Sequence, residues 1–355
     1  MVMAVLYACS FAPLALFDAF GLTSRRLVPS AKDPAVAGGM LHDNLCGHVK
    51  GVLERIFSWP DPQDLFLVVV SCDAMRRMAD ALLETWGPAR VLVLDLPVCP
   101  DEEGMRYFAA SLIKLGQRLT ELTGRPLHAH ALYRSLALRN ELAEHLERLR
   151  GQVHTEGVRT GPAGAMNVLR ELTDLPVGEA LERIDAFLAP PPLPRDPNTV
   201  PVYLFGTIQP DPRYFDLVVE AGLAVTGLGT CDAYRPHEVA FALAPELSTP
   251  ALLEAYASAL LGRSPCPTLC RCERSSTLVA HHLAAAHACS ARGAVLLTLK
   301  YCDPYLAKVP ELRRAFQEAN CPLLVLEGEA GPNLPGQART RLQAFAELLT
   351  ARGVA

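Results

Sequence analysis

The residues best able to do chemistry in this chain are its cysteines, which number eleven. Three of them, Cys72, Cys231 and Cys302, follow apolar runs of the β-strand type, and these runs read DLFLVVVS, LAVTGL and AVLLTL. In open α/β sheets, ligands bind at the carboxyl ends of the strands. We therefore expect these three thiols at the functional edge of a parallel sheet.

The remaining cysteines of interest also fall near expected loops or helix starts. Cys46 lies in HDNLCGHVK, ahead of an amphipathic helix expected over residues 49–57, and Asp43 or Asn44 is its expected cap. Cys9 ends an apolar run in YACSFAP. The segment CPTLCRC supplies three more: Cys266, Cys270 and Cys272. One such cysteine could simply be a small core residue. Their joint placement favours ligation.

Thiolates are the ligands of iron–sulfur clusters, and a nearby helix N-terminus favours the charged thiol. The spacing has neither the paired CxxC of structural zinc sites nor the compact run of bacterial ferredoxins. Spacing alone thus indicates a metal or redox role without naming the metal. Four nearby arginines could either balance the charge of such a group or lie on a solvated helix face: Arg76, Arg77, Arg271 and Arg274.

Composition excludes several classes of function. The chain has 355 residues, half of them hydrophobic, and a formal net charge of −5 without a basic run, which argues against nucleic-acid binding. Residues 1–20 are apolar, but Pro13 and Asp18 interrupt them and no basic segment precedes them. We expect a buried strand and helix there rather than a signal peptide or membrane span. A cytoplasmic location, where thiols stay reduced, follows.

Apolar strand-like runs alternate with helical patterns in both halves of the chain, which is typical of parallel βαβ units. The predicted fold class is α/β, with two Rossmann-like parallel-sheet domains. The first domain is expected over residues 1–189, with a helical extension at about 102–185 that Gly124 and Pro126 interrupt. A proline-rich linker at 190–199 leads to a second domain at 200–355.

At these residues the chain resembles the family of 2-hydroxyacyl-CoA dehydratase and benzoyl-CoA reductase subunits. The resemblance runs over nearly the whole sequence. It is carried by SFAPLALFDAFGL, HDNLCGHVKGVLE, VSCDAMRRMADAL, LPVCPDEEGMRYFAASLIKL, LKYCDPYLAKVPELRRAF and LEGEAGPNLPGQARTRLQAFAELL.

The resemblance implies a [4Fe-4S] cluster held by Cys46, Cys72 and Cys302, with one iron left open to another ligand. It also implies electron delivery by a separate ATP-hydrolysing iron–sulfur activator. The chain itself has no GxxxxGK[ST] motif, so nucleotide chemistry has to come from that partner.

The additional cysteines make the chain most similar to the double-cubane cluster branch, in which two cubanes share a bridging sulfide. The second ligand set implied is Cys9, Cys231 and either Cys266 or Cys270, and the division of the six between the cubanes stays open. The other cysteines outside the motifs are expected to be structural: Cys99, Cys289 and Cys321.

Proton donors for a reduction are less clearly marked. His42 and His48 flank Cys46 and are the candidate catalytic residues, and His281 and His282 are alternatives that more often pack in a helix. An aspartate follows each strand-end cysteine, and we expect these to cap helices rather than to act in catalysis: Asp73, Asp232 and Asp303.

Three functions are consistent with these residues. The first is a double-cubane reductase that takes electrons from the activator and reduces a small substrate at low potential. The second is a single-cluster dehydratase subunit, in which one electron added to a thioester makes a ketyl radical and expels a hydroxyl. The third is a non-catalytic electron-storage or maturation protein. A homodimer is expected, because symmetric pairs are the commonest oligomers.

Overall fold

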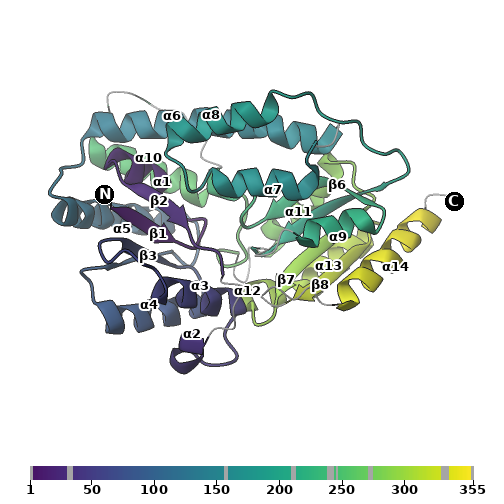
Figure 1. Ribbon diagram of the computed structural model, residues 1–355, viewed down its shortest axis with the longest axis horizontal. Helices are drawn as coiled ribbons and strands as arrows, with labels where there is room; N and C mark the ends of the chain where they lie inside the picture. The colour runs from purple at the N-terminus through teal and green to yellow at the C-terminus, as the bar shows by residue number, and fades with distance from the viewer. Residues whose placement is uncertain are drawn as a thin grey trace.

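The computed structural model describes residues 3–29, 35–155, 159–208, 213–237, 244, 247–270, 275–328 and 336–352. Its framework is two four-stranded parallel sheets, each packed against helices (Figure 1). The predicted α/β class with two Rossmann-like sheets is confirmed.

The first sheet has the strand order β2-β1-β3-β4. Every residue of β3 is buried, because its run of branched and aromatic side chains is covered on both faces. The order reverses between β1 and β3, so the loops after these neighbouring strands leave in opposite directions and open a crevice. The strands are β1 (Ala4–Tyr7), β2 (Thr23–Arg26), β3 (Leu65–Val70) and β4 (Val91–Asp95).

The second sheet repeats this arrangement in the order β6-β5-β7-β8, with the reversal between β5 and β7. All seven residues of β7 are buried. Its strands are β5 (Val200–Gly206), β6 (Leu223–Thr230), β7 (Gly293–Leu299) and β8 (Leu323–Gly328).

The helices of the first part of the chain include the one expected over residues 49–57, which spans residues 47–57. The expected interruption of the helical extension is found at Gly124, where a helix ends and φ is 68°. The helices of this part are α1 (Leu14–Ala19), α2 (Ala35–Met40), α3 (Gly47–Phe57), α4 (Asp73–Trp86), α5 (Glu102–Thr123), α6 (Ala129–Thr155), α7 (Gly161–Glu171) and α8 (Val177–Leu188). Those of the second part are α9 (Arg213–Glu220), the 3₁₀ helix η1 (Arg235–His237), α10 (Thr249–Leu261), α11 (Ser275–Ala288), α12 (Asp303–Leu306), α13 (Val309–Glu318) and α14 (Gly336–Arg352).

Helices from one half of the chain complete the core of the other. The long helix α6 buries Leu132 and Leu136 with the first sheet and Leu142 to Val153 with the second, so it runs past both (Figure 1). Helices α7 and α8 pack into the core of the second sheet, whereas α10 packs against α5 in the core of the first. The two sheets are therefore joined by shared helices.

The proline-rich segment at 190–199 contains neither helix nor strand, and it leads directly into β5. The domain boundary placed there, between 1–189 and 200–355, stays a prediction, since the exchange of α7, α8 and α10 crosses it. Among the described residues, no helix has the length and apolar character needed to cross a bilayer.

Candidate metal centre

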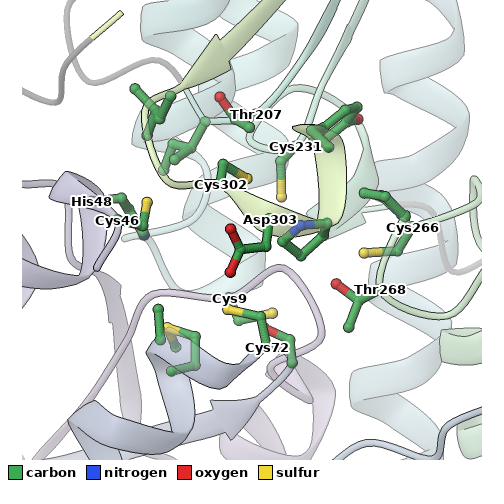
Figure 2. Close-up of a pocket in the computed structure, with 18 of the residues that line it drawn as sticks. Cys9, Cys46, His48, Cys72, Thr207, Cys231, Cys266, Thr268, Cys302 and Asp303 are labelled. Atoms are coloured by element: carbon green, nitrogen blue, oxygen red, sulfur yellow. The ribbon is translucent and has the colours of Figure 1, made fainter. Parts of the chain in front are cut away.

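The carboxyl ends of strands from both sheets open into one cavity of about 530 Å³. Cys9 follows β1 and Cys72 follows β3, on either side of the reversal in the first sheet. Cys231 follows β6 and Cys302 follows β7 in the second sheet. Figure 2 shows sulfur atoms from both parts of the chain facing this space. The cysteines that line it are Cys9, Cys46, Cys72, Cys231, Cys266 and Cys302.

The three cysteines of the first set share a local setting, because each is the N-cap of a helix. Cys46 precedes α3, Cys72 precedes α4 and Cys302 precedes α12. The free N–H groups of a helix N-terminus stabilise negative charge there. This corrects the expected caps: Asp43 and Asn44 lie outside α3, while Asp73 and Asp303 are the first residues of their helices and follow the cap.

Burial opposes this stabilisation and keeps these sulfurs protonated in the absence of a cation. Burial raises the pKa of Cys72 to about 11, and the neighbouring Cys46 thiol adds to the rise. Burial also raises the pKa of Cys46 and of Cys302, while the amides of His48 and Val49 oppose the rise at Cys46. A bound metal would reverse this, because a coordinating thiol loses its proton.

The second set lies in loops rather than at helix caps. Burial, followed by the nearby Cys231 sulfur, raises the pKa of Cys9 to about 12. The amide of Cys231 donates to Gly206 O (3.0 Å), which ties this loop to β5. The loop that carries Cys266 is held by Arg235, whose Nη2 donates to Pro265 O (2.6 Å).

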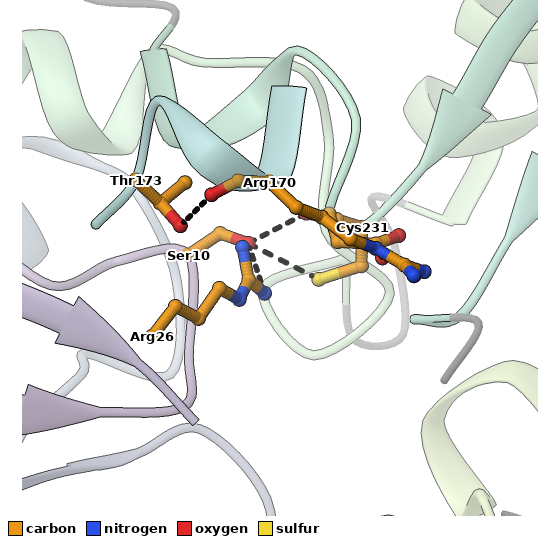
Figure 3. A network of polar contacts seen from close by, with 6 residues as sticks. Ser10, Arg26, Arg170, Thr173 and Cys231 are labelled. Carbon is orange, nitrogen blue, oxygen red and sulfur yellow. Dashed lines mark hydrogen bonds and ion pairs between the residues drawn. The ribbon is translucent and has the colours of Figure 1, made fainter. Parts of the chain in front are cut away.

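A network of hydrogen bonds holds the loop that carries Cys231 (Figure 3). Ser10 Oγ donates to Cys231 O (2.6 Å) and lies 3.3 Å from its sulfur. Arg26 Nη2 donates to Ser10 Oγ (3.0 Å), and Arg263 Nη1 donates to Ser10 O (2.6 Å). The network thus joins β2 and the loop after β1 to the loop after β6, which lies 221 residues further along the chain.

Asp232, next to Cys231, is buried in an ion pair rather than at a helix cap. Its Oδ2 accepts from Arg170 Nε (3.0 Å) and Nη2 (2.8 Å), and its side chain is 1% exposed. Because α7 carries Arg170, this pair fixes the Cys231 loop to the helical layer. The expected capping role of Asp232 is therefore wrong.

The other described cysteines fall outside the cavity lining. Cys270 is buried one turn beyond Cys266 and borders a different cavity, so the structure brings Cys266, rather than Cys270, to the other thiols. Cys289 and Cys321 are buried in the core of the second sheet, and Cys99 does not line the cavity either. Cys272 lies outside the described residues, as do Arg271 and Arg274.

Of the two candidate catalytic histidines, only His48 reaches the cavity. Burial lowers its pKa to about 4, helped by the Arg26 guanidinium, so the imidazole is neutral near neutral pH. His42 is exposed, and its Nδ1 accepts from the amide of Asn44 (3.1 Å).

Neither His281 nor His282 lines the cysteine cavity; both border a separate one. The side chain of His282 is buried and pairs through Nδ1 with the Tyr203 hydroxyl (3.0 Å).

Arg76 and Arg77 are about half exposed and pair with acidic groups on the solvated face of α4 and β4. Among the described residues, the cationic side chains of the cavity wall are instead Arg26, Arg235 and Lys308. The sequence did not single them out, because Arg26 lies in a short polar strand and nothing in the pattern marks which arginine or lysine faces the cavity.

The donor set fits an iron–sulfur group in its chemistry, because the donors are cysteine thiols. Among the described residues, no three His, Cys, Asp or Glu side chains converge on one point as mononuclear ligands would. Cluster thiolates instead bind different irons around a volume. Six cysteines line the one cavity and supply thiols of the kind that such a group requires.

One of the comparisons with known proteins identifies a family for this chain. A search of curated proteins found no match. A family model described as 2-hydroxyglutaryl-CoA dehydratase, D-component, matches residues 9–349, which include all six cysteines of the cavity and every strand of the two sheets except β1. The match agrees with the resemblance found in the sequence motifs, and the chain belongs to this dehydratase family.

Proposed function

We propose that the chain holds a double-cubane iron–sulfur cluster and reduces a small substrate at low potential. The observation that carries the proposal is the gathering of six cysteines around one cavity, three from each predicted set. A single [4Fe-4S] cluster of this family needs only three thiolates. The other three cysteines would then line the same cavity without binding iron.

The chain's own residues would bind and shield the cluster. Cys46, Cys72 and Cys302 are offered by helix N-caps. Cys9, Cys231 and Cys266 are offered by loops, of which Ser10 holds the Cys231 loop and Arg235 the Cys266 loop. When bound, the cluster would supply electrons. His48, neutral at the wall, would relay a proton from solvent to a substrate in the cavity, with one ring nitrogen accepting a proton as the other donates one.

Electrons would come from an ATP-hydrolysing iron–sulfur activator, in keeping with the family and with the absence of a P-loop motif in the sequence. We also propose a homodimer, since one chain supplies a full ligand set and two-fold pairs are common. Oxygen-free cytoplasm is the expected setting, because reduced thiols and low-potential clusters persist there.

The test is the iron content of single-cysteine variants purified without oxygen. Cys231→Ala and Cys266→Ala should each lower bound iron by about half, whereas Cys270→Ala, one turn away, should leave it unchanged. Full iron in both Cys231→Ala and Cys266→Ala would overturn the proposal. Iron loss in Cys270→Ala with full iron in Cys266→Ala would reassign the sixth ligand.

The second candidate is a dehydratase subunit with one [4Fe-4S] cluster on Cys46, Cys72 and Cys302. The family match favours it, because the matched model describes a dehydratase component. Here the cavity space beside the remaining cysteines would take the acyl end of a CoA thioester. Protection of Cys9 and Cys231 from alkylation by a 2-hydroxyacyl-CoA would support it, and unchanged alkylation would count against it.

A further inference from the structure

Arg26 is a buried cation with spare hydrogen-bond donors at the cavity wall. The residue is 7% exposed, and its Nη2 is used by Ser10 Oγ. Its Nε and Nη1 have no partner among the described residues. A guanidinium stays charged at any physiological pH, and a buried charge without acceptors is costly. The cavity is where an acceptor for these two N–H groups can lie.

Tyr305 presents a second spare donor to the same cavity from the other sheet. It is 3% exposed, lies in α12 directly beyond Cys302, and its hydroxyl has no partner among the described residues. Burial raises the pKa of Tyr305 well above its ordinary value, so the hydroxyl keeps its proton. Buried polar groups are nearly always paired, so this hydroxyl also calls for an acceptor.

Both donors lie in the wall of the cavity that Cys231 also lines. Arg26 is linked to Cys231 through one side chain, because Ser10 Oγ accepts from the guanidinium and contacts the cysteine sulfur. The Cys231 thiol acts electrostatically on both Arg26 and Tyr305. An acceptor next to Cys231 would therefore meet donors from both halves of the chain.

The chemistry of that acceptor follows from the proposed function, on which this inference rests. Sulfides and thiolates of an iron–sulfur cluster are anionic acceptors, and hydrogen bonds to them, together with nearby positive charge, raise the reduction potential. We propose that Arg26 and Tyr305 are positioning residues that donate hydrogen bonds to sulfur atoms of the cubane bound at Cys231 and so raise its reduction potential.

The strand β2 supplies a matched control. Arg25 precedes Arg26 on the same strand but is exposed, so Arg25→Met removes the same charge without touching the cavity. Arg26→Met removes charge and donors, Arg26→Lys keeps the charge but loses the guanidinium fork, and Tyr305→Phe removes one donor with little change in shape.

The experiment is an anaerobic redox titration of the iron-loaded full chain, followed by electron paramagnetic resonance, with iron measured in each sample. Arg26→Met should move the midpoint potential of one iron–sulfur signal to a more negative value. Arg26→Lys and Tyr305→Phe should produce smaller shifts in the same direction, and Arg25→Met should titrate as the unaltered chain does.

Arg26→Met and Tyr305→Phe variants that hold full iron and titrate as the unaltered chain would overturn the inference and assign the donors to water. If Arg26→Met fails to hold iron, Arg26→Lys and Tyr305→Phe decide the matter by the same comparison. The iron content of the unaltered chain reports separately on the proposed function. About eight irons with unshifted variants would overturn the inference alone, and about four would overturn both.

Discussion

The two cysteine sets line one cavity but are held by different kinds of structure. Cys46, Cys72 and Cys302 each cap a helix, so backbone geometry places them. Cys231 depends on buried side chains, chiefly Ser10 and the Arg170–Asp232 pair beside it. A site set by the backbone is lost only with its ligands or its fold. A site set by a side-chain network can be altered by one substitution far from any cysteine.

The largest expected effect is on the first set. Cys46→Ala, Cys72→Ala and Cys302→Ala should each remove the iron of that cubane, about four per chain, because no other thiol of this set can replace the lost ligand. Iron and absorbance after oxygen-free purification measure this.

Cys321→Ala is the matched control, since this cysteine is buried in the core of the second sheet and outside the cavity. Undiminished iron in all three first-set variants would show that the helix caps do not hold a metal.

The next effect tests whether the second set depends on its network. Asp232→Asn should lower the free energy of unfolding by about 3 kcal/mol, because it leaves the partly buried Arg170 without its carboxylate, and should also reduce iron bound at Cys231. Denaturant unfolding and iron analysis measure the two changes.

Asp18→Asn is the control for that variant. It breaks another buried pair, Arg139–Asp18 (2.7 Å), in the core of the first sheet, so a similar loss of stability is expected with iron unchanged. Equal iron loss in both variants would mean that the network has no specific role at Cys231.

The smallest effect concerns His237, which packs on α7 through Nε2 and Leu169 O (3.3 Å). Burial lowers its pKa to about 3, with Arg139 contributing, so the folded chain holds the neutral imidazole. The unfolded chain takes up a proton below pH 6.5 and the folded chain does not. Stability should therefore fall as the pH drops from about 6.5 toward 3.

His237→Gln should flatten that slope, and the exposed His130→Gln should leave it unchanged. Urea unfolding at several pH values distinguishes them. The same slope in His237→Gln and the unaltered chain would show that this histidine is not held neutral.

The sequence predicts the strands that are continuous apolar runs, because such runs suit a sheet covered on both faces. LFLVVV and GAVLLTL are examples, and both are fully buried. It does not predict β2, whose residues are TSRR, since a short polar strand has no alternation or apolar run to mark it.

The same limit explains what was missed in the candidate site. Cysteines that follow strands can be recognised in the sequence from their residue type and position. Six of the seven expected ligands line the same cavity. Arg26 lies in β2 and donates a hydrogen bond to Ser10, a contact that only the folded chain creates. The choice between Cys266 and Cys270 likewise depends on which side of one loop turn faces the cavity.

The most direct test of the account is the iron and acid-labile sulfide content of the unaltered chain after strictly anaerobic production. The account predicts about eight irons per chain, shared between the two cysteine sets. About four irons per chain, with no further loss in Cys231→Ala, would contradict it and leave only the cluster of the first set.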